Sequence, residues 1–214
     1  MTINEHSSIK LTGSVNIYFD PFNIKNPEHD GDFVFITHPH YDHFSPEDIK
    51  KVMNAGTVFV APASMEEEFN SLSLDNEVIF MKPGEEICPG EIVVESIPAY
   101  NINKPYHPKE NEWLGFVVQM DGTTYYVCGD TDNIPEGKDV CCDVVLVPVG
   151  GTYTMTPPEA AAFVKEIDPS VAIPTHYGTV VGTPDMGQKF IKLLNIISDD
   201  IEGREIRCNS EADS

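Results

Sequence analysis

The order of apolar and polar residues along the chain predicts many short strands and a few helices. Asp121 and Gly122 separate two alternating runs and give a strong signal for a two-residue hairpin. Beyond this hairpin, strand-like runs alternate with helical patterns, which is typical of an α/β fold. Apolar or alternating runs typical of half-buried or buried strands lie at residues 9–11, 15–19, 33–37, 57–60, 78–81, 92–97, 114–120, 124–128, 144–147 and 171–174.

Helix starts are marked by capping residues. Ser45, Pro46 and Asp48 predict a helix start with a capping box, and Thr156 and Glu159 repeat the pattern. Helices are expected at about residues 46–53, 63–70, 157–167 and 184–196. No repeat or linker is visible, so we expect a single domain over residues 1–214, with a frayed tail at 209–214.

The charge balance narrows the choice of partners. The chain has 13 basic and 35 acidic residues, a formal net charge of −22, and its only arginines are Arg204 and Arg207. Such a chain repels phosphate backbones and lacks the basic stripe that nucleic-acid binding requires. A small-molecule substrate is therefore expected, and the sequence leaves open whether the chain forms a homo-oligomer.

Other features of composition favour a cytoplasmic protein. No apolar run approaches the roughly 20 residues that span a bilayer, so no membrane partner is expected. The first residues lack the pattern of a secretory signal. The five cysteines form no CxxC pair, which fits a reducing compartment and suggests neither a disulfide framework nor a thiolate zinc site.

The richest chemistry lies in residues 37–43, directly after an apolar strand-like run. Three imidazoles and one carboxylate, the ligand types that borderline divalent metals prefer, fall within six residues at His38, His40, Asp42 and His43. Along an extended chain the first three point roughly one way and His43 points elsewhere. One short loop could therefore serve two neighbouring metals. The alternative without a metal is an ordinary loop of surface polar groups.

Three more candidate ligands come later in the chain. Asp130 and His176 each follow a predicted strand, and sites in α/β folds gather at the carboxyl ends of strands. His107 lies in a proline-rich loop, and only His6 and His29 remain outside the set. The alternatives without a metal are that Asp130 caps a turn and that His107 is a loop histidine stacked on a neighbouring side chain.

Together these motifs resemble the metallo-β-lactamase-fold superfamily of metal-dependent hydrolases. The match joins Thr37–His43, His107, Gly129–Thr131 and Pro174–Thr179, and extends from about Ile9 to His176 and the helix beyond. Residues 36–49 and 150–155 are similar to the branch of ascorbate-6-phosphate-lactonase-like proteins. The resemblance implies an α/β fold that is a four-layer αββα sandwich.

The resemblance also implies a site with two divalent metal ions, Zn²⁺ first and Mn²⁺ or Fe²⁺ as alternatives. It assigns His38, His40 and His107 to one ion, Asp42, His43 and His176 to the other, and Asp130 to both. Asp42 and Asp130 would hold and position a metal-bound hydroxide that attacks an ester, lactone, amide or phosphoester of a small molecule. Tyr153 is a candidate hydrogen-bond donor to the developing oxyanion, and the general acid is not assigned.

Other functions of the same fold remain as alternatives. They are a nucleic-acid-processing nuclease, which the acidic charge disfavours, and a non-catalytic metal- or ligand-binding protein. A di-iron redox role is disfavoured because such relatives carry a carboxylate where this chain has His40. Relatives usually begin with a longer hairpin that carries a Gly-His-Ala-Ser-like turn, so we expect a shortened N-terminal hairpin here.

Overall fold

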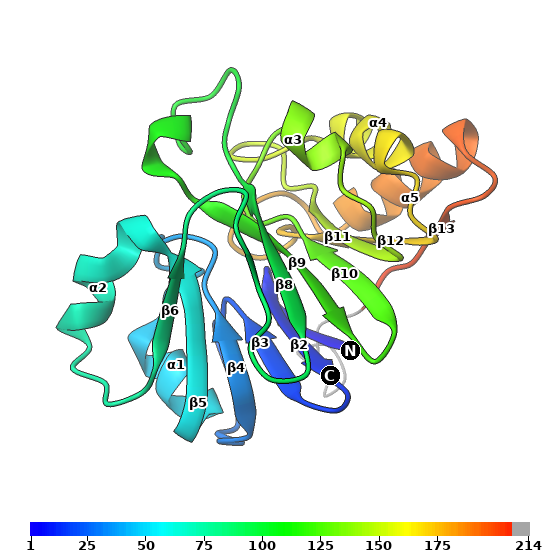
Figure 1. Cartoon of the computed structure of the whole chain (residues 1–214). Coiled ribbons are helices and arrows are strands. Elements are labelled where there is room, and N and C mark those ends of the chain that lie inside the picture. The colour runs from blue at the N-terminus through cyan, green and yellow to red at the C-terminus, as the bar shows by residue number, and fades with distance from the viewer. Residues whose placement is uncertain (207–214) are drawn as a thin grey trace. The chain divides into compact units, whose positions relative to one another are not determined.

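The computed structural model describes residues 1–206, and within them the chain divides into two compact units, Met1–Lys82 and Pro83–Ile206. Each unit contains one β-sheet and its own helices (Figure 1). The mixed α/β class predicted from the sequence is confirmed. The predicted frayed tail at 209–214 lies outside the described residues, and the single domain stays a prediction.

The first unit is built on a six-stranded mixed sheet. The strand order is β1-β2-β3-β4-β5-β6, antiparallel from β1 to β3 and parallel from β3 to β6. The strands are β1 (Thr2–Glu5), β2 (Ser8–Thr12), β3 (Asn16–Phe19), β4 (Gly31–Phe35), β5 (Met53–Pro62) and β6 (Val78–Met81). The helices are α1 (Pro46–Val52), the 3₁₀ turn η1 (Ala63–Met65) and α2 (Glu66–Ser71).

The core of this unit forms where helices cover the parallel strands. Val34 of β4 and Phe59 of β5 belong to one buried cluster with Ile49 of α1 and Phe69 of α2. This packing anchors the carboxyl end of β4, where the histidine-rich loop begins.

The second unit is built on a seven-stranded mixed sheet in the order β13-β12-β11-β10-β9-β8-β7. β7 to β10 are antiparallel and β10 to β13 are parallel. The strands are β7 (Glu86–Ile87), β8 (Val93–Pro98), β9 (Leu114–Met120), β10 (Thr123–Val127), β11 (Val144–Pro148), β12 (Val171–Thr175) and β13 (Glu202–Gly203). The helices are η2 (Lys109–Asn111), α3 (Pro135–Lys138), α4 (Pro157–Ile167) and α5 (Met186–Ile197).

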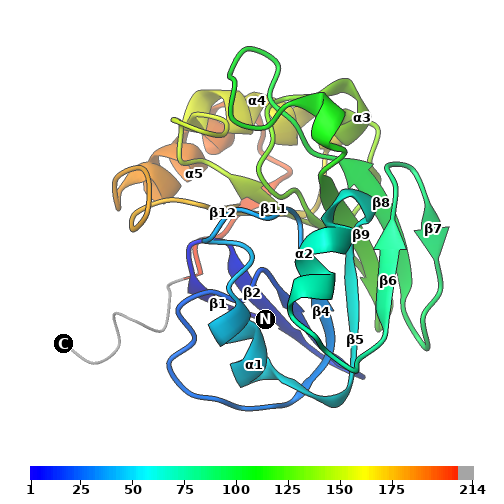
Figure 2. The same ribbon diagram turned by 90° about the vertical axis from the view of Figure 1, so that its left-hand side faces the viewer.

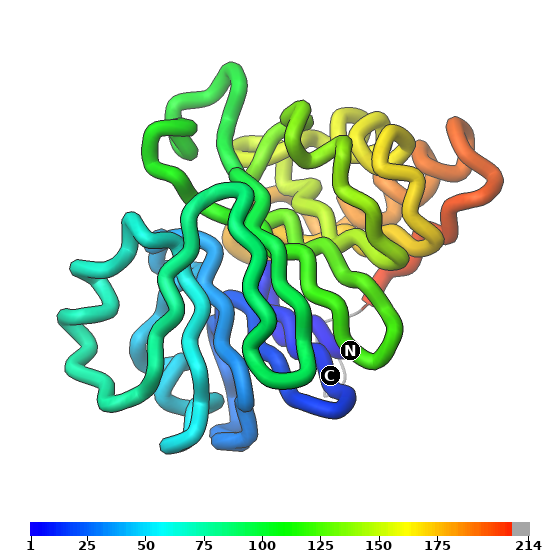
Figure 3. The backbone as a smooth tube through the Cα atoms, in the orientation of Figure 1, coloured from blue at the N-terminus to red at the C-terminus, as the bar shows by residue number. Residues whose placement is uncertain are grey.

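Helices α4 and α5 cover the parallel half of this sheet (Figure 2). Phe163 of α4 and Phe190 of α5 are fully buried in one cluster with Val145 and Val147 of β11. The loop between β8 and β9 projects from the sheet (Figure 3) and carries His107. The packed helices thus fix strand ends, and the loops at those ends carry the candidate ligands.

Most predicted elements are present, within a few residues of their predicted bounds. The Asp121–Gly122 turn joins β9 to β10 with both residues at positive φ, 53° and 77°. The capping box of α4 is confirmed, because the Thr156 amide donates to Glu159 Oε2 at 2.7 Å. β1, β7, β13 and α3 have no counterpart among the elements predicted from the sequence.

Two expectations need correction. The hairpin expected to be shortened is preceded by β1, which pairs with β2 through a tight turn at His6. His6 takes a φ of 57° without help from glycine, so the turn lacks the glycine that usually marks such a position. In α1, Ser45 caps the helix as predicted, but the Asp48 carboxylate binds the Asn23 and Ile24 amides and does not close a capping box.

Among residues 1–206, no helix combines the length and the apolar character needed to cross a membrane.

Candidate metal centre

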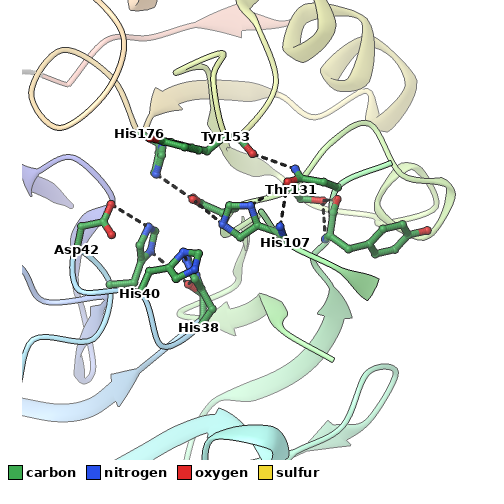
Figure 4. A network of polar contacts seen from close by, with 12 residues as sticks. His38, His40, Asp42, His107, Thr131, Tyr153 and His176 are labelled. Carbon is green, nitrogen blue, oxygen red and sulfur yellow. Dashed lines mark hydrogen bonds and ion pairs between the residues drawn. The ribbon is translucent and has the colours of Figure 1, made fainter. Parts of the chain in front are cut away.

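In the first unit, the loop after β4 gathers the ligand-type residues of the motif. His38 and His43 are almost completely buried, with ring centroids 4.0 Å apart. His38 Nε2 lies 3.0 Å from His40 Nδ1 (Figure 4). Asp42 is also buried and its Oδ2 lies 3.7 Å from His43 Nε2. The sequence motif therefore becomes a compact cluster of imidazoles and a carboxylate, buried except for the half-buried His40.

Asp20 and Thr37 orient two of these histidines, a role the sequence analysis missed. Asp20 Oδ2 lies 2.7 Å from His43 Nδ1, and Asp20 also accepts the Thr37 amide at 2.8 Å and hydroxyl at 2.7 Å. The Thr37 hydroxyl lies 2.9 Å from His38 Nδ1. Because Nδ1 of both rings is engaged, Nε2 is the candidate ligand atom of each. Such partners of a ligating imidazole fix its orientation and raise its basicity.

Asp20 is completely buried beneath the cluster. Burial raises the pKa of this carboxyl, although His43 and the Thr37 hydrogen bonds act in the opposite direction. The only sequence signal for Asp20 was its place in an Asp-Pro turn after β3, which does not show that it reaches His43.

His6 is a further histidine of this cluster that the sequence analysis set aside. It is buried in the β1–β2 turn, and its Nε2 lies 3.3 Å from Asp42 Oδ2. One ligand-type atom from each of His6, Asp42 and His43 lies within 4.8 Å of the others. Residues 5–8, Glu-His-Ser-Ser, resemble the Gly-His-Ala-Ser-like turn of relatives, and this resemblance could have identified His6.

In the second unit, three predicted ligands meet although they lie far apart in the sequence. Asp130 Oδ2 is 3.3 Å from His107 Nε2 and 2.9 Å from His176 Nε2. Asp130 follows β10 and His176 follows β12, two strands that flank β11, so their carboxyl ends lie along the same edge of the sheet. All three side chains are buried. The prediction that strand ends would bring Asp130 and His176 together is confirmed.

The loop with His107 is held by two polar side chains. The Asp132 carboxylate accepts the Ile102 amide at 2.9 Å and pairs with the Lys104 ammonium. Asn101 binds both the backbone and the ring of His107. Asp132, two residues after Asp130 in the sequence, thus supports the loop that carries His107.

His176 is placed by an unusually close approach of two backbone segments. It has a φ of 58°, and a Cβ added to Gly150 would lie 2.3 Å from the His176 carbonyl oxygen. The same Cβ would lie 3.2 Å from His176 Nδ1. Only glycine fits at residue 150 without moving the histidine.

Three tyrosines close in sequence to the candidate ligands or to Gly150, Tyr41, Tyr153 and Tyr177, have different surroundings. Tyr153 is 37% exposed, and its ring packs edge-on against Tyr106 with centroids 4.7 Å apart. Tyr41 is exposed and packs edge-on against Phe22. The Tyr177 hydroxyl donates to Glu205 at 2.7 Å, so it supports the fold rather than an oxyanion.

A pocket of about 580 Å³ opens beside the His107 loop in the second unit. Its lining includes the Asn101 and Tyr100 side chains and two lysines, Lys104 and Lys109. Lys109 donates to Glu136 at 2.7 Å, and Tyr100 donates to the same carboxylate at 2.9 Å. Burial alone would raise the pKa of Glu136, but these hydrogen bonds outweigh it and the pKa is lowered.

The donor chemistry of both clusters fits divalent metal ions. Imidazole nitrogens and carboxylate oxygens suit Zn²⁺, Mn²⁺ and Fe²⁺ alike. Buried charged groups are expensive unless they are paired or bind a metal, and both clusters contain several buried ionisable side chains.

Known proteins are similar to this chain in both sequence and fold. The beta-lactamase superfamily domain matches residues 1–176. A UPF0173 metal-dependent hydrolase of Thermococcus kodakarensis is 30% identical over 186 residues, covering 81% of this chain and 82% of the relative. Another from Archaeoglobus fulgidus is 32% identical over 193 residues, covering 81% of each. The crystal structure of a candidate metal-dependent hydrolase from Parabacteroides distasonis has a TM-score of 0.78 and 28% identity, covering 95% of this chain and 90% of its own.

Proposed function

Because the chain belongs to the beta-lactamase superfamily and is a metal-dependent hydrolase, we propose that it uses two metal ions to hydrolyse a small molecule. The observation that carries the proposal is that each unit presents a group of ligand-type side chains at its strand ends, all of them buried except the half-buried His40. We define the first-unit group as His38, His40, Asp42 and His43, and the second-unit group as His107, Asp130 and His176.

The proposed ligand sets are those that the family resemblance implies. One ion would be held by His38, His40 and His107, and the other by Asp42, His43 and His176, with Asp130 shared. The 2.9 Å and 3.3 Å distances from Asp130 Oδ2 to the His176 and His107 Nε2 atoms support its shared role. Zinc is our first choice of metal, with manganese or iron as alternatives.

When bound, the ions would lower the pKa of a coordinated water to about 7 and polarise the oxygen of the scissile bond. The protein contributes orientation. Asp20 and Thr37 hold the rings of His43 and His38, and Asp42 and Asp130 would supply the carboxylates that position the attacking water. The Tyr153 hydroxyl is proposed as the donor to the developing oxyanion.

We propose that the substrate is an uncharged ester, lactone or amide rather than a phosphoester. Both ammonium groups of the pocket are paired with carboxylates, Lys104 with Asp132 and Lys109 with Glu136. Glu110 also lines the pocket, so its charge is not positive overall. A site that binds phosphate uses basic groups or backbone amides that are available to the anion. The similarity to the ascorbate-6-phosphate-lactonase-like branch stays a prediction.

We also propose that the enzyme acts in the cytoplasm on a small molecule and binds neither nucleic acid nor membrane. The net charge of −22 disfavours binding to the phosphate backbone of a nucleic acid. The cysteines at 88, 128, 141 and 142 form no disulfides, which fits a reducing compartment. The fifth cysteine, Cys208, lies outside the described residues.

The test joins metal analysis to a substrate panel. Purified protein is analysed by inductively coupled plasma mass spectrometry, and we expect two equivalents of transition metal. Zinc-loaded protein is then assayed with neutral aryl esters, lactones, anilides, a phosphodiester and single-stranded RNA. We expect turnover in the neutral group. His40→Ala and Asp130→Ala should lose at least about 100-fold in kcat/KM, because an incomplete ligand set misplaces the ion.

His29→Ala is the matched control, since His29 is an exposed histidine of the first unit whose Nδ1 lies 3.0 Å from the Met53 carbonyl oxygen. Protein that binds no transition metal, or full activity in both variants, would overturn the proposal. Faster cleavage of the phosphodiester or RNA than of every neutral substrate would overturn the substrate class alone.

A further inference from the structure

The Asn101 side chain lies between two loops of the second unit, and its contacts involve one of the proposed ligands. Asn101 Oδ1 lies 3.1 Å from the His107 amide nitrogen and 3.1 Å from His107 Nδ1. Asn101 Nδ2 donates to the Tyr153 carbonyl at 2.9 Å, and the Asn101 amide donates to the His107 carbonyl at 2.7 Å. Asn101 is buried, 7% exposed.

These contacts determine which way the carboxamide faces. The His107 amide can only donate, and the Tyr153 carbonyl can only accept. The carboxamide oxygen must therefore face His107 and its NH₂ group must face Tyr153. An exchange of the two atoms would oppose donor to donor and acceptor to acceptor.

The orientation of the carboxamide in turn determines the tautomer of His107. A carboxamide oxygen accepts only, so the His107 Nδ1 that faces it must carry the proton. The lone pair of the neutral ring is then on Nε2, the atom that lies 3.3 Å from Asp130 Oδ2. The tautomer needed for coordination through Nε2 is thus set before any ion binds.

We propose that Asn101 is a positioning residue for metal binding: its carboxamide fixes the His107 tautomer and ties the His107 loop to the loop of Tyr153. The inference rests on the proposed function in one respect, the assignment of His107 as a ligand. Asn101 is itself neither one of the proposed metal ligands nor the proposed donor to the oxyanion.

The experiment compares three variants of the full chain. Asn101→Ala removes every side-chain bond. Asn101→Asp keeps an acceptor for both His107 N–H groups but loses the donor to Tyr153. Asn103→Ala makes the same change at an exposed asparagine of the same loop and is the control. Zinc affinity is measured by competition with a chromogenic chelator, and the His107 tautomer of metal-free protein by long-range ¹H–¹⁵N NMR.

We expect Asn101→Ala to bind one of two zinc equivalents about 10- to 100-fold more weakly and to lose the pure Nδ1–H tautomer. Asn101→Asp should keep that tautomer and an affinity nearer to the unmodified protein, while Asn103→Ala changes neither. If the role of Asn101 is only structural, Asn101→Asp and Asn101→Ala should weaken zinc binding equally. The metal-free form of each variant should then also be less thermally stable, to a matching extent.

That equal loss, or an Nε2–H tautomer in unmodified protein, would overturn the inference. The outcome is separable from the proposed function. An inactive protein that still shows the tautomer and affinity contrast would contradict the hydrolase assignment and leave the role of Asn101 standing.

Discussion

At the scale of single residues, Asp48 shows how one side chain can join a helix to a distant loop. Its carboxylate accepts the Asn23 amide at 2.9 Å and the Ile24 amide at 3.0 Å, and pairs with Lys51 at 2.8 Å. The Ser45 hydroxyl donates to it at 2.8 Å. This carboxylate therefore ties the segment after β3 to helix α1 and to Ser45, at the end of the histidine-rich loop.

Asp48→Asn should destabilise the protein by about 1–3 kcal/mol, because charge-assisted hydrogen bonds to a buried carboxylate are lost. Urea unfolding of metal-free protein at pH 7 measures the change. Glu47→Gln is the control, since Glu47 is an exposed neighbour in the same helical turn. Equal stability of the two variants would contradict this role of Asp48.

The difference in unfolding free energy between Asp48→Asn and the control Glu47→Gln should depend on pH. Burial alone would raise the pKa of Asp48, but the Lys51, Ser45 and backbone hydrogen bonds outweigh it, so the folded-state pKa lies below the usual value. A lowered pKa gives stability that is present above the unfolded pKa of about 4 and is lost as pH falls through the folded pKa. The difference in unfolding free energy should thus be constant from pH 7 to 5 and shrink below pH 4.

At the scale of elements, the loops that follow β11 and β12 must approach each other closely. Gly150 follows β11 and His176 follows β12, the neighbouring parallel strand. The 2.3 Å separation between an added Cβ at 150 and the His176 carbonyl leaves no room for a methyl group. The position of this ligand therefore depends on a glycine in another loop.

Gly150→Ala should destabilise the metal-free protein by about 1–3 kcal/mol through overpacking, and should weaken zinc binding because His176 must move. Urea unfolding and chelator competition measure the two effects. Gly56→Ala is the control, since its added Cβ meets only Asn54 Oδ1, at 3.4 Å. If Gly150→Ala matches the parent protein in both measurements, the close approach does not constrain His176.

At the scale of the whole molecule, the acidic charge and the buried ligand groups make bound cations a source of stability. The chain carries a formal charge of −22, and the buried carboxylates Asp42 and Asp130 each face imidazoles. Divalent ions would offset the negative charge of these buried carboxylates and would bind only the folded chain with high affinity.

Removal of metal with EDTA should therefore lower the melting temperature. An ion at 100 times its Kd contributes about 2.7 kcal/mol, which corresponds to a shift of about 5–10 °C for a chain of this size. Differential scanning calorimetry with and without added zinc measures it. Asp130→Ala should respond much less to EDTA, and an equal response in both proteins would show that the stabilising ion binds elsewhere.

Much of this protein is determined by short-range patterns in its sequence. Strand alternation and the Asp121–Gly122 turn act between neighbouring residues, so β9 and β10 could be predicted closely. The ligand-type character of residues 38–43 is equally local, because it depends only on residue types and their spacing. The carboxyl ends of β10 and β12, on either side of β11, also bring Asp130 and His176 to one edge of the sheet, which the α/β pattern predicts.

The tertiary structure decided which other side chains support the ligands. Asp20 reaches His43 across 23 residues of sequence, Asp48 reaches Ile24 across 24, and Asn101 reaches Tyr153 across 52. His6 joins Asp42 through a turn that carries no glycine signal. Such contacts depend on how chain reversals and helix packing bring distant segments together, and no local pattern of residues encodes them. The sequence by itself determined the ligand-type residues and the elements that carry them, whereas only the folded units decided how those residues are oriented and held.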